Sequence, residues 1–146
     1  MDELVRWLGE QLDEDERIAR TATQGPWSVD SGEYAEAIYA ADRTTAVVAG
    51  GRWGGEASVF ESTEDALHIA AHDPVRVLRE IDAKRQLLTT YEAAKRNSEL
   101  PHPEFVQGVY PPAVFVSGYA SALEYALRLL VLVYGDRPGY REEWRP

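Results

Sequence analysis

The sequence has 146 residues, with 15 basic and 25 acidic side chains and a formal net charge of −10. This length is typical of one domain around a single core, so we expect one domain spanning residues 1–146. The acidic excess repels nucleic-acid phosphates and argues against direct binding of DNA or RNA. The sequence contains no cysteine, which excludes disulfides, thiolate catalysis and cysteine-based metal sites.

The N-terminal segment predicts an amphipathic helix over residues 3–22. It opens with acids and lacks the basic and apolar regions of a signal peptide, so we expect a cytoplasmic protein. Apolar side chains recur on one side at helical spacing: Leu4, Trp7, Leu8, Leu12, Ile18, Ala19 and Ala22. The Gly25-Pro26 pair then ends any continuation of the helix.

Residues 27–61 change character from helix to sheet. Short β-branched or aromatic runs, WSVD, EAIYAAD, TTAVVAG and EASVF, alternate with turn-forming segments. This pattern predicts an antiparallel meander of three or four strands. One turn, GGRWGG, carries Arg52 and Trp53. A cation beside a large aromatic ring suits stacking on a base and pairing with a phosphate, which makes this turn a candidate ligand- or partner-binding site.

The helical period returns over residues 63–96, which predict two helices with an elbow at residues 73–74. Pro74 disfavours the α conformation at Asp73, so the first helix should end near His72. Asp73 can then cap the second helix. Pro74 would be the first residue of that helix, the position at which a proline costs no hydrogen bond.

Two further segments complete the predicted fold. Residues 97–118 contain four prolines and little periodicity, which predicts a loop. Residues 119–134 predict a last helix, and residues 135–146 a charged tail with Tyr140 and Trp144 as candidate partner-binding side chains. The sequence therefore predicts an α+β fold: an N-terminal helix, a small antiparallel meander, then three helices, of which the last is buried.

The last predicted helix has an unusually wide apolar surface. Its only polar positions are Ser121, Glu124 and Arg128, so nearly its whole circumference calls for burial. Charges near the centre of a membrane span cost several kcal/mol each, which argues against membrane insertion. Either this helix is the centre of the domain, or it is shared with a second subunit. We expect a homodimer or another protein partner, because two-fold dimers are the commonest assembly.

His68 and His72 lie four residues apart on the polar side of the helix that precedes the elbow, together with Glu64 and Asp65. Two histidines at this spacing can hold one metal ion, and a carboxylate one turn earlier offers a third ligand. No HExxH motif supplies a positioned base. A solvated helix face is the favoured interpretation, so we expect no bound metal and no cofactor. The pair remains a candidate ligand-binding site.

Several segments carry a resemblance to known proteins. EDALHIAAHDPVRVLREIDAKRQLL, LRLLVLVYGDRPGYREEWRP and the opening MDELVRWLGEQLDEDERIARTAT resemble an uncharacterised family of small proteins from Streptomyces, related actinobacteria and their phages, known only as a domain of unknown function. TQGPW at residues 23–27 is similar to the TPGPW motif of phage early-region accessory proteins, with Gln24 in place of the proline. Many members of the family carry cysteines before the last helix, and this sequence has none.

Recognisable catalytic motifs are absent from the sequence. It contains neither a phosphate-binding GxxxxGK[ST] motif nor a GxSxG nucleophile elbow. The leading hypothesis is therefore a non-enzymatic small binding or regulatory protein acting through protein contacts. The alternative is a phage-type protein that binds or sequesters a nucleotide or signal molecule. A metal-dependent hydrolase using His68 and His72, and an acidic mimic of DNA, are less favoured.

Overall fold

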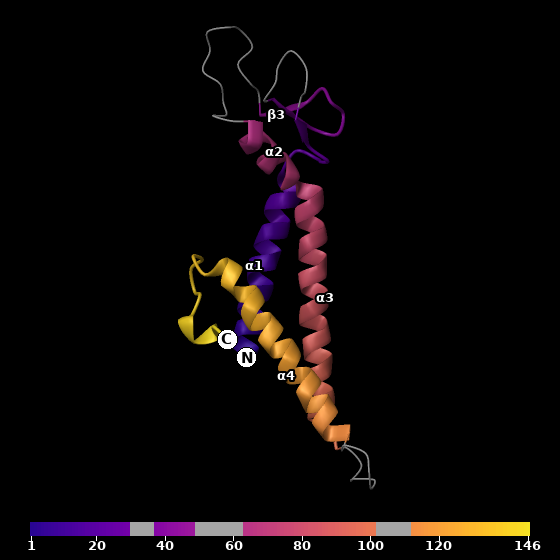
Figure 1. The fold of residues 1–146 in the computed structure, drawn as a ribbon, viewed down its shortest axis with the longest axis vertical. Helices are drawn as coiled ribbons and strands as arrows, with labels where there is room; N and C mark the ends of the chain where they lie inside the picture. The colour runs from indigo at the N-terminus through magenta and orange to yellow at the C-terminus, as the bar shows by residue number, and fades with distance from the viewer. Residues whose placement is uncertain (30–36, 49–62, 102–111) are drawn as a thin grey trace. The chain divides into compact units, whose positions relative to one another are not determined.

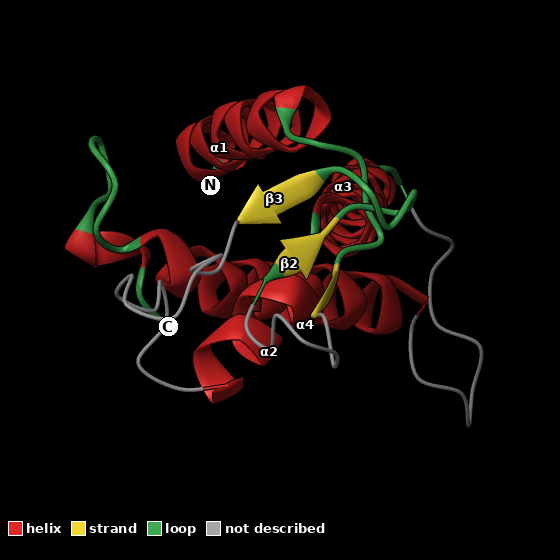
Figure 2. Cartoon of the chain, turned by 90° about the horizontal axis from the view of Figure 1, so that it is seen from above, coloured by secondary structure: helices red, strands yellow, loops and turns green. Residues whose placement is uncertain are grey.

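The computed structural model describes residues 1–29, 37–48, 63–101 and 112–146 (Figure 1). The helices are α1 (Asp2–Thr21), α2 (Thr63–Ala71), α3 (Pro74–Ser98) and α4 (Pro112–Val131), followed by the 3₁₀ helices η1 (Leu132–Tyr134) and η2 (Glu142–Trp144). Strands β1 (Ser28–Val29), β2 (Ile38–Tyr39) and β3 (Ala46–Val48) form one antiparallel sheet in the order β1-β2-β3 (Figure 2). The predicted α+β class is confirmed.

The chain divides into two compact units. One consists of residues 1–13 and 82–146, and the other of residues 14–81. The division falls inside α1 and inside α3, so each of these helices contributes to both units. The expectation of a single domain stays a prediction.

The unit of residues 1–13 and 82–146 packs the start of α1 against the later turns of α3 and against α4 (Figure 1). Arg85 bonds to Asp13 at 2.6 Å, and Lys95 bonds to Asp2, so α1 and α3 run antiparallel. The hydrogen bond from Lys95 lowers the pKa of the Asp2 carboxyl. The core of this unit is apolar or aromatic: Leu4, Trp7, Leu8, Leu12, Leu88, Tyr91, Ala94, Leu127, Val131, Tyr134 and Trp144 are buried.

Helix α4 begins earlier than predicted. The sequence predicted a loop over residues 97–118 and a helix from residue 119, but α3 continues to Ser98 and α4 starts at Pro112. The prediction is wrong because Pro112 occupies the first helical position, where a proline costs no backbone hydrogen bond. Ser117 and Gly118 lie within the helix, and the Ser117 hydroxyl donates to the carbonyl oxygen of Val114 at 3.2 Å.

An aromatic cluster joins the C-terminal segment to α1. The ring of Trp7 lies 5.0 Å from Trp144, 6.1 Å from Tyr140 and 6.4 Å from Tyr134, measured between ring centroids. The Trp7 indole N–H donates to the carbonyl oxygen of Pro138 at 3.1 Å. These contacts bury residues from both ends of the sequence in one core.

The unit of residues 14–81 contains the sheet and α2. Strand β1 pairs with β2, and β2 with β3, with an irregularity between Ile38 and Tyr39. Helix α2 packs against β1. Ile38, Ala66 and Ala70 form the buried core, against which Trp27, Val29, Val47 and Val48 pack. The meander is confirmed for three strands, and the fourth expected run, at residues 56–60, lies outside the described residues.

Helix α2 buries less of its surface than the sequence predicted. On a helical wheel, Leu67 and Ile69 lie on the apolar side of this helix, opposite His68 and His72, but 54% of Leu67 and 37% of Ile69 are exposed. The prediction was wrong because only the alanines reach the sheet: Ala66 and Ala70 are buried. Their short side chains let the helix approach the strands closely and leave the larger neighbours outside.

The turn between β2 and β3 is organised by Asp42. The Asp42 carboxylate accepts hydrogen bonds from the backbone N–H groups of Thr44 and Thr45, at 2.9 and 2.8 Å, and from the Thr45 hydroxyl at 2.7 Å. Arg43 adopts a positive φ of 57° and donates its N–H to the carbonyl oxygen of Ala40. The side chain thus supplies the bonds that the turning backbone lacks.

We expect the pKa of the Asp42 carboxyl to lie well below the usual value for an aspartate. The bonds from Thr45, then that from Thr44, lower the pKa of Asp42 to about 2, from a usual value of 3.8. Because the folded-state pKa is the lower one, the stabilisation is complete above about pH 4 and is lost as the pH falls towards 2. A carboxyl titration by NMR, with Asp42→Asn to assign the signal, should show this midpoint. A midpoint near 3.8 would mean that the turn is not formed.

Candidate functional site

The elbow between α2 and α3 is built around Asp73, which is 7% exposed. The Asp73 carboxylate accepts a hydrogen bond from the backbone N–H of Arg76 at 2.7 Å, which confirms the predicted cap of α3. Its other oxygen accepts from the backbone N–H of Trp27 at 3.1 Å. A methyl group at Gly25 would lie 2.9 Å from the Asp73 carboxylate, so the close approach requires glycine. The GPW and HDP segments of the sequence therefore meet at one carboxylate.

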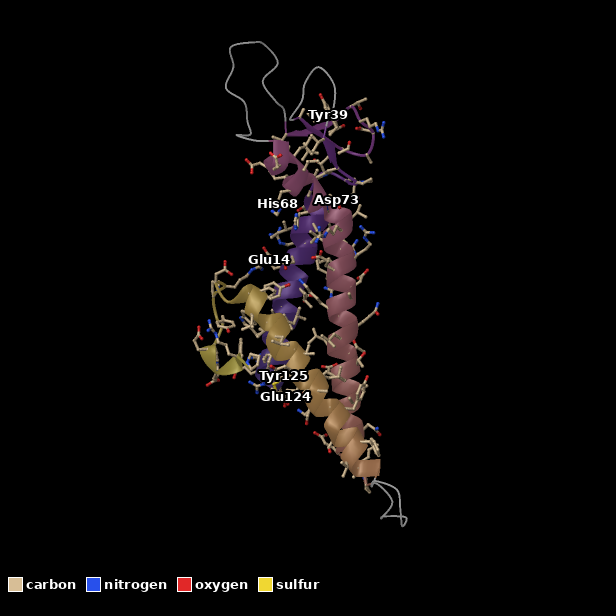
Figure 3. The ribbon with its side chains drawn as sticks, in the orientation of Figure 1. Glu14, Tyr39, His68, Asp73, Glu124 and Tyr125 are labelled. Atoms are coloured by element: carbon tan, nitrogen blue, oxygen red, sulfur yellow. The ribbon has the colours of Figure 1, made fainter. Side chains whose placement is uncertain are left out.

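His68 lies on α2 and His72 directly follows the last residue of that helix, beside this elbow. Figure 3 shows His68 and Asp73 near the bend. Both histidines are exposed, and their ring centroids are 4.4 Å apart. The Nδ1 atom of His72 lies 2.8 Å from the carbonyl oxygen of His68. A carbonyl oxygen only accepts, so this nitrogen carries the hydrogen. Within the described ranges, no group of three or more potential metal-ligating side chains gathers.

The remaining candidate residues differ in what the structure says of them. Arg52 and Trp53 lie outside the described residues, so the binding role expected of that turn stays a prediction. Trp144 is buried and Tyr140 is half-buried, and both rings pack against Trp7. Their contacts lie within one unit of the chain. Whether they also bind a partner stays a prediction.

A shallow hollow of about 490 Å³ lies between the first turns of α1 and the last turns of α3. Tyr91 lines it, and burial raises the pKa of the Tyr91 hydroxyl. Basic side chains, including Arg6 and Arg96, alternate with acidic ones around the hollow, and Lys95 is already paired with Asp2. Because acidic and basic side chains line the hollow in equal number, it favours neither an anion nor a cation. The hollow therefore does not indicate a particular ligand.

The most distinctive surface is the outer face of α4, a name used here for seven residues without charge that share one side of that helix. They are Val114, Phe115, Gly118, Tyr119, Ala122, Tyr125 and Leu129, and all of them are exposed. The three aromatic side chains are between 55% and 62% exposed. Leu132 and Val133 of η1 extend the surface and are 40% and 65% exposed. This face therefore offers a continuous apolar contact surface.

The opposite side of α4 packs against other residues of the same chain. Leu127 and Val131 are completely buried, and Tyr134 accepts a hydrogen bond from the Lys84 ammonium at 3.1 Å. The sequence predicted that nearly the whole surface of this helix is buried. Within the described part of the chain, only its inner side is buried. By length and composition, Ala113–Tyr134 is the one described segment that could cross a membrane, and 11% of its apolar window is buried.

The charged residues of α4 lie at one border of the outer face and are held there. Arg128 donates to the Glu124 carboxylate at 3.1 and 3.2 Å, and Figure 3 shows Glu124 next to Tyr125 on the helix. Arg128 also donates to the carbonyl oxygen of Glu143, at 3.2 Å, in η2. The two charges are thus used within the unit, and the outer face contains none.

The first two turns of this face lie where the sequence predicted a loop. Val114 and Phe115 fell in the predicted loop, although Pro112 is a typical first helical residue, and apolar or small residues follow it at helical spacing. Those signals would have extended the last helix and its apolar surface. The wide apolar arc itself was predicted correctly.

These features define a small α+β protein with an exposed apolar helix face and a capped elbow between two helices. The chain matches a family model over residues 1–146, described as a family of unknown function, DUF6221. The chain therefore belongs to this family, which confirms the resemblance to an uncharacterised domain. No curated protein and no solved structure shows significant similarity to the chain.

Proposed function

We propose that this protein is a non-enzymatic binding or regulatory protein of the cytoplasm that acts by contact with a protein partner, through the outer face of α4. The observation that carries the proposal is the exposure of Phe115, Tyr119 and Tyr125 on a single uncharged helix face. Aromatic side chains are enriched at protein interfaces, where they bury a large area at a small cost in conformational entropy.

The size of the face supports a role in binding. With about 200 Å² for a whole aromatic side chain and somewhat less for an aliphatic one, the exposed fractions of the outer face together with Leu132 and Val133 amount to on the order of 700 Å². The largest apolar patch on a typical monomer is about 300–600 Å², and larger patches mark contact sites. Leaving such a face in water would also promote aggregation, so its occupation by a partner explains why it is tolerated.

The proposal is tested by the chemical accessibility of the face. The chain has no cysteine, so a single introduced cysteine reports on one position. At nanomolar concentration, the thiol of Tyr125→Cys should react with a maleimide as fast as that of Gln86→Cys, on the exposed side of α3, because both side chains are exposed. The thiol of Val131→Cys, at a buried position of α4, should react far more slowly.

Two outcomes would contradict the proposal. If Tyr125→Cys in the dilute protein reacts as slowly as Val131→Cys, the chain itself covers the face. The face is then part of the core and binds no partner. If Tyr125→Cys stays fully reactive at every concentration of the protein, including that found in the cell extract from which it is purified, nothing occupies the face.

A further inference from the structure

We infer that the partner of the outer face of α4 is a second copy of this chain, packed α4 against α4 about a two-fold axis. The inference rests on the proposed function, because it uses the same face. In a two-fold dimer one patch serves both sides, so the patch must be complementary to itself. A flat, uncharged helix surface with small residues at its centre meets that condition.

Charge is the first argument for self-recognition. Each copy carries a formal charge of −10, so most surfaces of two copies would bring acid against acid. The outer face contains no charged residue, and the carboxylate of Glu124 at its border is neutralised by Arg128 of the same helix. Two copies of an acidic chain can approach each other closely at such a face without an unpaired charge.

Gly118 is the second argument. It lies inside α4, where a glycine costs roughly 0.5–1 kcal/mol relative to alanine. A side chain at Gly118 would meet no atom within 4 Å, so nothing in the described chain requires a glycine there. Together with Ala122, one turn later, it leaves a shallow strip between Tyr125 and Phe115. A second helix laid across this strip would approach the backbone closely and would account for the glycine.

The area agrees with the size of a stable dimer. The face, with its extension over Leu132 and Val133, exposes on the order of 700 Å² per copy, and a standard protein interface buries about 800 Å² per partner. The interface would be predominantly apolar, as in homodimers that form without another partner. The face is therefore large enough for a dimer without a contribution from other surfaces.

A lipid bilayer fits the structure less well than a second copy. Leu127 and Val131 hold the inner side of α4 in the core, and Arg128 bonds to a backbone carbonyl of η2. Insertion of the helix would break these contacts and would place Glu124 and Arg128 in the hydrocarbon, at several kcal/mol each. The acidic net charge also repels anionic lipid headgroups.

The test compares the same substitution at two helical glycines. Gly9 in α1 and Gly118 in α4 both have open space above them, but only Gly118 lies on the outer face. Glutamine favours helix over glycine at either position, so neither Gly9→Gln nor Gly118→Gln should unfold the protein. Sedimentation velocity from 0.1 to 200 μM (roughly the range of weak to tight homodimers) gives the mass of each variant, and circular dichroism checks its helix content.

We expect the wild type and Gly9→Gln to have twice the chain mass of 16.4 kDa at the higher concentrations. Gly118→Gln should raise the dissociation constant by on the order of 100-fold, because the obstruction enters a two-fold interface twice. In parallel, Tyr125→Cys should become protected from maleimide as the dimer forms, and Gln86→Cys should not.

Four outcomes would overturn the inference. A monomeric mass at every concentration, with Tyr125→Cys reactive, would remove the second copy and leave the face open for another partner. A monomeric mass with Tyr125→Cys unreactive would remove the proposed function as well. Dimers unaffected by Gly118→Gln would place the interface elsewhere. Co-sedimentation of the wild type with phosphatidylcholine vesicles, lost in Gly118→Gln, would assign the face to a lipid surface.

Discussion

Replacing Trp7 with alanine should lower the free energy of unfolding by about 3–5 kcal/mol, the range found for buried tryptophans. Trp7 contacts Tyr134, Tyr140 and Trp144, so its removal leaves a cavity at the junction of α1 with the C-terminal segment. Urea unfolding followed by circular dichroism measures the loss. The near-ultraviolet spectrum should lose most of its intensity, because it reports on packed aromatic rings.

Two controls separate packing from hydrogen bonding at this position. Trp7→Phe retains a ring but loses the bond to Pro138, and should cost clearly less than the alanine variant. Gly139→Ala tests the same contact from the other side. Gly139 has a φ of +84°, and a methyl group there would lie 2.9 Å from the Trp7 indole nitrogen. If Trp7→Ala had the stability of the wild type, the C-terminal segment would not pack on α1.

Replacing Asp73 with alanine should lower the free energy of unfolding by about 1.5–5 kcal/mol. Loss of the cap of α3 accounts for about 0.5–2 kcal/mol. The N–H of Trp27 would also lose its partner in a half-buried site, which adds about 1–3 kcal/mol. The two losses add because a single carboxylate accepts both bonds. Urea unfolding monitored by helix content measures the total.

The matched substitutions at the elbow differ only in the bonds that they remove. Asp73→Asn keeps one oxygen for Arg76 or for Trp27, but not for both, and should fall between alanine and the wild type. Asp82→Ala removes an exposed carboxylate from the same helix and should change the stability by less than about 0.5 kcal/mol. Equal effects of Asp73→Ala and Asp82→Ala would show that Asp73 caps nothing.

The sequence predicted the helices well where strong local signals mark their ends. The Asp73-Pro74 pair located the elbow to the residue, because a proline restricts its predecessor and suits the first helical position. The same local chemistry could have located the start of α4 at Pro112. That helix was placed too late because the four prolines and the weak periodicity of residues 97–118 favoured a loop.

Contacts between distant residues were not predictable from the sequence. Periodicity identified Trp7 as a core residue, but nothing local indicates that the rings of Tyr140 and Trp144 complete that core. The bond between Asp73 and Trp27 likewise joins positions that are 46 residues apart. The exposure of Leu67 on α2 could not be predicted for a related reason. A helical wheel shows which side chains share a side, but the depth to which the helix sits on the sheet decides whether Leu67 becomes buried.

The sequence predicted a wide apolar surface on the last helix, but not where that surface begins or which part of it stays exposed. The sequence showed that the last helix is too apolar to be solvated all round, and it left two modes of burial open. The structure buries the side of Leu127 and exposes the side of Tyr125. Which of the two arcs turns inward depends on the packing of α1 and α3, and a single helix sequence carries no information on that choice.

The division of the chain also has a consequence for the order in which it folds during synthesis. The unit of residues 14–81 is continuous, so all of its contacts are available once residue 81 has left the ribosome. The other unit waits for the last residues, because Glu3 bonds to Arg141 across 138 positions. Until α3 is synthesised, the apolar side of the nascent α1 lacks the residues on which it packs in the folded protein, so Leu4, Trp7 and Leu8 are available to chaperones that bind exposed hydrophobic segments. The acidic side chains around them keep this early helix in solution while translation continues.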